Sequence, residues 1–169
     1  MTAVREVEVD EGGTPIDVLE RYFLARGWSV SRDGEDEVIA TAGGSWTQVE
    51  LRGLWRADDG VLQFLALPDV RVGSDKRALV HETLGLVNEG MWLGHWELWT
   101  GSGMIVLRHA LLLDADTEEP LSDEMAETTV GAALDECERY YPVFQFVLWG
   151  GKTPAEAIAA AMIETHGEA

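Results

Sequence analysis

A chain of 169 residues has the length of one domain and can bury a core without disulfides or structural metals. Its 46% apolar and 8% aromatic residues exclude general disorder. The 31 acidic residues outnumber the 12 basic ones and give a formal charge of −19. Nucleic acid is therefore not an expected partner, because phosphate binding depends on Lys and Arg. Such a charge favours solubility, and it also suits a basic protein partner.

The first thirteen residues are acidic, and we expect them to form a flexible segment ahead of a single domain at residues 14–166. They carry no secretion signal. No apolar run approaches the ~18 residues that a membrane-spanning helix needs. Cys137 is the single cysteine, which excludes an intramolecular disulfide and a cysteine-based zinc site. These features predict a cytoplasmic protein without a membrane span.

A first helix is predicted to begin at Thr14 and to end at Gly27. The Thr14 hydroxyl can cap free amides, and the proline that follows suits the first helical turn. Apolar residues recur at helical spacing and predict one buried face: Ile16, Leu19 and Phe23.

Residues 28–72 change to a period of two, which predicts an antiparallel meander. Along the long strand Trp46–Arg56 one face should meet a core, because apolar residues at odd positions alternate with polar ones at even positions: Val49, Leu51 and Trp55 against Gln48, Glu50, Arg52 and Arg56. A four-residue turn then places Gly53 opposite Phe64, whose ring could cover the bare glycine backbone. Val61–Leu67 is apolar on both faces, which predicts a central strand.

A second helix should begin at the capping pair Ser74-Asp75 and end near Asn88 and Gly90, because glycine readily adopts the left-handed conformation at helix ends. Its apolar face is predicted from steps of four, three and four: Val80, Leu84, Val87 and Met91.

A hairpin is predicted next, with strands at His95–Thr100 and Met104–Leu113. A three-residue turn at 101–103 would place His95 opposite His109, and Trp96 opposite Arg108. A two-residue turn shifts that register by one, so both alternatives remain open.

The segment Asp114–Glu138 holds ten acidic residues and no basic one, and a third helix should begin at Ser122. Pro142 is expected to kink or break that helix near Glu138. Its apolar seam could pack internally or between subunits: Ala126, Val130, Ala133, Cys137, Tyr140, Phe144 and Val147. A last helix should begin at Thr153-Pro154, where Glu156 completes a capping box.

Strands joined by hairpins, rather than strictly alternating with helices, predict an α+β fold with an antiparallel sheet of five to six strands flanked by helices. Two blocks of the sequence then show a resemblance: the residues around Asn88-Glu89, Leu93–Leu98 and Arg108–Ala110, and the stretch Asp135–Gly151. They resemble the YbjN-like family over roughly residues 14–166. The resemblance implies a fold similar to the type III secretion chaperones, which are small, acidic and usually dimeric. It also implies a role as a regulator of sensory transduction, and it supplies no catalytic residues.

Aromatic residues are the candidate partner-binding residues. Three tryptophans of the hairpin region could line a groove, and a homodimer is predicted with residues 140–149 at or beside its interface. The full set is Trp92, Trp96, Trp99, Tyr140, Tyr141, Phe144 and Trp149. Tryptophans are also ordinary core material, and an acidic run is usually a solvated helix face.

No enzyme motif is present, since the sequence lacks GxSxG, a P-loop, a GxGxxG behind a strand and HExxH. His95, Glu97 and His109 could approach one another in a geometry that a divalent metal could use. Histidines on alternating strands more often hydrogen-bond locally or pack beside aromatic residues, so we expect no metal and no cofactor. Cys137 on the apolar seam should be an inert buried thiol. The leading hypothesis is a non-enzymatic protein-binding or chaperone-like regulatory module. The alternative is a small-molecule or metal-binding sensor that uses the Trp/His hairpin.

Overall fold

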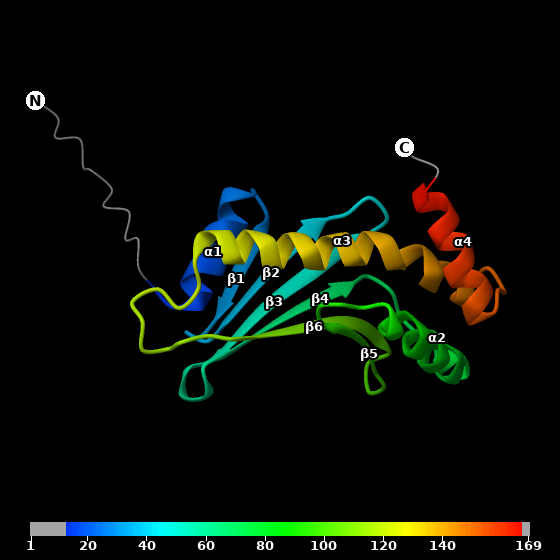
Figure 1. Ribbon diagram of the computed structural model, residues 1–169, viewed down its shortest axis with the longest axis horizontal. Coiled ribbons are helices and arrows are strands. Elements are labelled where there is room, and N and C mark those ends of the chain that lie inside the picture. Colours follow the sequence, from blue (N-terminus) through cyan, green and yellow to red (C-terminus); the bar gives the residue numbers. More distant parts are fainter. Residues whose placement is uncertain (1–12, 167–169) are drawn as a thin grey trace, which may run out of the picture.

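The computed structural model describes residues 13–166 (Figure 1), and the expectation for the first twelve residues lies outside them. One antiparallel sheet has the strand order β1-β2-β3-β4-β6-β5, which confirms the predicted α+β fold. The strands are β1 (Ser29–Asp33), β2 (Glu37–Gly43), β3 (Gln48–Arg56), β4 (Val61–Pro68), β5 (His95–Trp99) and β6 (Met104–Leu112). The helices are α1 (Pro15–Ala25), α2 (Arg77–Glu89), α3 (Asp123–Leu148) and α4 (Pro154–His166).

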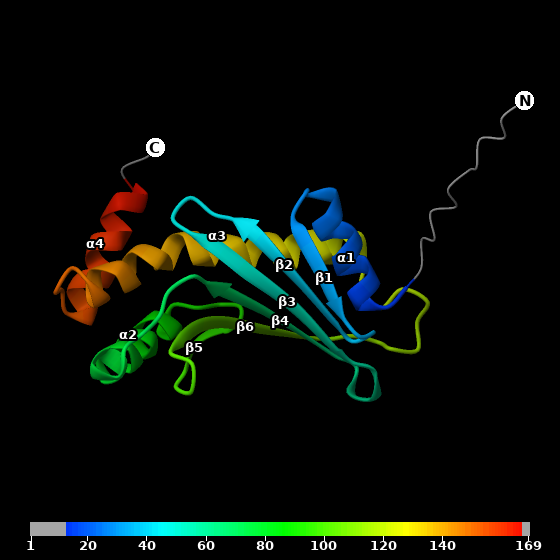
Figure 2. The same cartoon turned by 180° about the vertical axis from the view of Figure 1, so that it is seen from behind.

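Helices cover one face of the sheet, and the long helix α3 crosses that face beside α1 (Figures 1 and 2). Helices α2 and α4 gather with the C-terminal part of α3 at one end of the molecule. One hydrophobic cluster draws side chains from all four helices and from the sheet, and a smaller one lies on the other sheet face around Leu65, Leu67 and Val106. Within residues 13–166 no helix is both long and apolar enough to cross a membrane.

The first helix and the meander follow the sequence closely. Thr14 and Asp17 form a reciprocal capping box at the start of α1, and the three predicted apolar residues of α1 are buried. Gly53 pairs with Phe64 as predicted. The side chain nearest to a Cβ at Gly53 would be Leu19 of α1, so glycine at this position allows α1 to approach the sheet closely.

Helix α2 ends at Glu89, near Asn88 and Gly90 as predicted, but its start and the conformation of Gly90 differ from expectation. A short 3₁₀ turn occupies Ser74–Lys76, and α2 begins without a side-chain cap, so the prediction that Ser74-Asp75 caps the helix was wrong. Gly90 follows the helix at φ −92°, in the right-handed region, and Gly94 has the positive φ of 69° instead. The Asn88 amide accepts from the Trp96 backbone N–H (2.8 Å) and donates to the Trp96 carbonyl (3.0 Å), which ties the end of α2 to β5.

The hairpin adopts the shifted register of the two alternatives. Trp99 pairs with Met104 and His95 with Arg108, so His95 does not face His109 and Trp96 does not face Arg108. Thr100 belongs to the connecting loop rather than to the strand. Residues opposite one another share a sheet face, so a shift by one residue places His95 and His109 on opposite faces.

Helix α3 runs unbroken through Pro142, contrary to the predicted kink or break near Glu138. Proline has no N–H, so the carbonyl of Glu138 four residues earlier loses its helical donor. The indole Nε1 of Trp46 donates to that carbonyl at 3.2 Å, and the Glu138 carboxylate accepts from the Ser45 backbone N–H at 2.7 Å. The β2–β3 loop therefore satisfies the carbonyl that Pro142 leaves free.

The apolar seam of α3 packs internally, since all seven of its side chains are buried in the main hydrophobic cluster. The last helix begins at the predicted position, where Thr153 and Glu156 exchange hydrogen bonds of 3.0 and 3.3 Å.

Candidate functional site

The two halves of β6 have different neighbours. β4 pairs with residues 107–112 of β6 along one side, whereas the five-residue β5 pairs only with Met104–Arg108 on the other. Beyond His95 the chain leaves the sheet, so the segment His109–Leu112 has no strand on its outer side within residues 13–166. This segment is an open sheet edge.

The ladder determines which backbone groups of that edge are unpaired. Leu113 donates to the Gly60 carbonyl at 2.8 Å, in line with the β4–β6 register. Hydrogen-bonded pairs alternate in an antiparallel ladder. The backbone N–H and C=O groups of odd-numbered β6 residues therefore point toward β4, and those of even-numbered residues point toward β5. Ala110 and Leu112 therefore direct N–H and C=O groups outward, where the described part of the chain supplies no strand partner.

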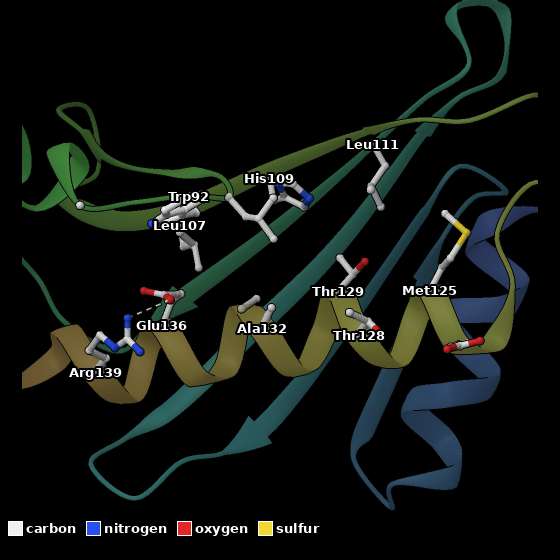
Figure 3. Close-up of a pocket in the computed structure, with 14 residues that line it drawn as sticks. Trp92, Leu107, His109, Leu111, Met125, Thr128, Thr129, Ala132, Glu136 and Arg139 are labelled. Atoms are coloured by element: carbon white, nitrogen blue, oxygen red, sulfur yellow. Dashed lines mark ion pairs between the residues drawn. The ribbon is translucent and has the colours of Figure 1, made fainter. Parts of the chain in front are cut away.

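A groove of about 450 Å³ lies between the open half of β6 and helix α3. Figure 3 shows Leu107, His109 and Leu111 pointing from β6 toward α3. The α2–β5 connection closes one end. The lining residues are Gly90, Trp92, Leu93, Leu107, His109, Leu111, Glu124, Met125, Thr128, Thr129, Ala132, Ala133, Glu136 and Arg139.

Large apolar side chains stand exposed around this groove. Trp92 is 98% exposed, and Leu93 beside it is 61% exposed. Leu112, on the open edge, is 86% exposed, and strand alternation turns its side chain to the sheet face away from α3 and the groove. Single exposed apolar residues are ordinary on protein surfaces, but a cluster beside a concave site indicates an interaction surface.

The groove is lined by a few polar side chains, among them His109, Glu136 and Arg139. Burial lowers the pKa of His109, which favours a neutral imidazole. Glu136 is 3.5 Å from Arg139 through Oε1, while its Oε2 is buried and has no hydrogen-bond partner within the described residues. An unpaired buried carboxylate oxygen is a ready acceptor for a cationic donor.

The structure does not bring the predicted aromatic residues together on one surface. Trp92 lies at the groove, but Trp96 is 2% exposed and packs in the core against Phe144 (5.1 Å between ring centroids) and Tyr140. Trp99 packs against the smaller cluster on the other sheet face. Tyr141 is also in the core, and Trp149 is exposed at the end of α3.

The hairpin polar residues form an ion-pair network on the face away from α3. Glu97 accepts from Arg108 (3.0 Å) and Trp99 (3.0 Å), and lies 2.7 Å from His95. Burial raises the pKa of Glu97, but these hydrogen bonds outweigh it and hold the pKa below its usual range. No group of three potential ligands within residues 13–166 could hold a metal ion.

Cys137 is buried on the seam, and burial together with neighbouring carboxylates raises its pKa to about 12. This thiol is therefore protonated at neutral pH, as the sequence predicted. The acidic run enters the site only through Glu124 and Glu136.

Sequence reasoning missed most of the groove lining. Leu107 and Leu111 read as ordinary strand residues, and Met125 and Ala132 as ordinary helix residues. The available signal was the unequal length of the two hairpin strands, five residues against nine. That difference predicts that the end of β6 extends beyond β5, so the alternating residues there lie at an open edge.

Comparison with known proteins gives one family. The model of the YbjN family, described as "Putative bacterial sensory transduction regulator", matches residues 15–146. A search of curated proteins gives no match.

Several solved structures are similar to this chain, and two of them illustrate the similarity. One is described as "Crystal Structure of the ExsC-ExsE Complex"; it has 22% sequence identity and a TM-score of 0.46, covering 73% of this chain and 88% of that one. The other is "Crystal structure of YbjN, a putative transcription regulator from E. coli", with 12% identity and a TM-score of 0.47, covering 76% of this chain and 94% of that one. At these values neither similarity bears on what this chain does.

Proposed function

The chain belongs to the YbjN family, and from that premise we propose that it regulates sensory transduction in the bacterial cytoplasm by binding a segment of a partner protein in the α3–β6 groove. The family description names a regulatory role and no reaction. The role proposed here is therefore recognition rather than catalysis.

The groove and its exposed rim carry this proposal. A concave apolar site with a few polar groups is the usual form of a binding site. Trp92 supplies a large aromatic surface beside it, and tryptophan is enriched among the residues that dominate binding energy. The strong negative charge of the chain would favour encounter with a basic partner.

A photo-crosslinking experiment in cells tests this function. A photoreactive benzoylphenylalanine replaces Leu93 at the rim or, as a control, Leu24 on α1, which is exposed to a similar degree (61% and 58%). We expect a specific protein adduct from position 93 and none from position 24. Equal adducts at both positions, or none at either, would contradict the proposal.

A groove-filling variant sharpens the same experiment. Ala132→Trp places a bulky ring among the lining residues and should abolish the adduct at position 93. Glu127→Trp adds the same ring at an exposed α3 position outside the lining and should leave the adduct in place.

A small-molecule sensor is the second candidate function, and the size of the groove favours it. About 450 Å³ lies within the ~300–1,000 Å³ typical of small-ligand pockets. A metabolite that raises the melting temperature of the wild type, but not that of Ala132→Trp, would support this candidate. The metal-binding form of the hypothesis has no such support, because His95 and His109 lie on opposite sheet faces.

We also propose that the chain forms a homodimer. The core packing of Tyr140 and Phe144 leaves Trp149 as the large apolar side chain of residues 140–149 that another subunit could contact directly. Light scattering in 150 mM salt should give twice the chain mass of 18.6 kDa, and Trp149→Asp should reduce it. A folded Trp149→Asp protein that remains dimeric would place the interface elsewhere.

A further inference from the structure

We propose that the occupant of the α3–β6 groove is an extended segment that pairs as a seventh strand with the open edge of β6. We further propose that this segment presents aliphatic residues between two basic ones on its groove side. The inference rests on the proposed function and specifies the chemistry of the partner.

The groove has the geometry of a missing strand position. Helix α3 runs alongside β6 on the far side of the groove, while β5 covers only the first part of the β6 edge (Figure 3). A strand placed beside His109–Leu112 would continue the line of β5. Its alternate side chains would point toward α3, into the space lined by Leu111, Thr129 and Ala132. The groove is thus the volume that a longer β5 would fill.

Backbone groups at this edge are already oriented for pairing. Ala110 and Leu112 each direct one backbone N–H and one C=O outward, and both residues are exposed. An added strand would satisfy these four groups, which is the mode by which sheet edges recognise extended peptides. A helical or compact ligand would leave them unpaired.

The two carboxylates of the groove indicate where the bound segment should carry basic side chains. Glu124 and Glu136 lie twelve residues apart on α3, toward opposite ends of the lining. Twelve helical residues span roughly 18 Å, and six strand residues span about 20 Å. Basic residues at positions 1 and 7 of a strand therefore match the spacing of the two carboxylates, of which Glu136 has an oxygen, Oε2, without a hydrogen-bond partner among the described residues. Positions 3 and 5 face the apolar middle and should be aliphatic.

Two synthetic peptides of identical composition test this arrangement. The first is acetyl-Lys-Thr-Val-Thr-Val-Thr-Lys-amide, which places both lysines on the groove side. The second, acetyl-Thr-Lys-Val-Thr-Val-Lys-Thr-amide, places both lysines on the opposite side. Calorimetric titration of the full chain should give at least tenfold tighter binding for the first peptide. Equal binding of both peptides would overturn the assignment of the two carboxylates.

Amide hydrogen exchange reports the strand pairing directly. Saturation with the first peptide should slow exchange at Ala110 and Leu112 at least tenfold. Ala110→Pro, which removes an outward N–H but no bond to β4, should weaken binding at least tenfold. Val30→Pro is the matched control, because Val30 N–H faces outward at the opposite edge by the same ladder argument. Dichroism spectra establish that both variants fold.

The outcomes separate this inference from the proposed function. Peptide binding without added protection at Ala110 and Leu112 would overturn the strand pairing, and so would unchanged binding in a folded Ala110→Pro protein. An adduct at position 93 in cells, together with no binding of either peptide, would overturn the partner chemistry and leave the proposed function intact. Protection that rises with protein concentration alone would place a second copy of this chain in the groove and overturn the inference.

Discussion

The two halves of strand β6 run beside the same helix, α3, but are packed differently. Met104–Arg108 pairs with β5 along its outer side, and the neighbouring Trp96 is buried against Phe144 of α3. His109–Leu112 has β4 on one side and a groove on the other. The difference arises from strand length, because the β5 ladder stops at Arg108, four residues before the end of β6 at Leu112. A fold can thus create a binding groove simply by leaving one strand short.

The largest expected effect contrasts two tryptophans four residues apart. Trp96→Ala empties a core position in the closed half and should lower the free energy of unfolding by about 3–5 kcal/mol. Trp92→Ala changes an exposed side chain and should alter the free energy of unfolding by no more than about 0.5 kcal/mol. Urea unfolding of both variants measures the difference. Equal losses would show that the two halves are not packed differently.

Two alanines of α3 sharpen the same comparison. Ala126 is fully buried on the seam, so Ala126→Trp should overpack the core and cost about 1–3 kcal/mol or more. Ala132 borders the groove, so Ala132→Trp has room and should change stability by about 0.5 kcal/mol or less. Thermal unfolding followed by dichroism provides the measurement. A large loss in Ala132→Trp would mean that the groove is too small to accept a side chain.

The sequence predicted local features well because they depend on neighbouring residues. The hydroxyl cap at Thr14, the capping box at Thr153, the alternation of β3 and the seam of α3 all follow from short-range spacing. Features that depend on distant residues were not predictable in this way. The continuity of α3 at Pro142 depends on Trp46, almost one hundred residues earlier in the chain.

The groove was hidden from the sequence for a similar reason. The hairpin register depends on whether Thr100 joins the strand or the loop, and both arrangements satisfy the same alternation. The groove depends on the relative lengths of two strands and on where α3 crosses them. Its apolar residues therefore resemble ordinary core positions when they are seen one element at a time.

A smaller effect tests how the closed part of α3 is held. Trp46→Phe keeps an aromatic ring but removes the donor to the Glu138 carbonyl, so it should cost about 0.5–1.5 kcal/mol. Urea unfolding detects a loss of this size. Replacing Pro142 with alanine in the Trp46→Phe background restores a backbone donor and should recover part of the loss. The absence of any recovery would mean that Trp46 does not compensate for Pro142.

The smallest expected effect concerns His109 and pH. Burial lowers the pKa of His109 in the folded state, so the unfolded chain binds a proton more readily. Its contribution to stability is therefore lost as the pH falls from the usual histidine pKa of 6.5 through the lower folded value. His109→Gln should show a smaller loss of stability between pH 7 and pH 5 than the wild type. Identical pH dependence in urea unfolding would show that His109 titrates alike in both states.

Hydrogen exchange along β6 in the unliganded protein tests the open edge most directly. Val106 and Arg108 point their amides toward β5, whereas Ala110 and Leu112 point theirs outward by the same alternation. We expect the first pair to exchange at least about 100-fold more slowly than the second, since paired amides exchange only through opening of the structure. Equal protection of all four amides would contradict this expectation, because the outer side of Ala110 and Leu112 would then already be occupied.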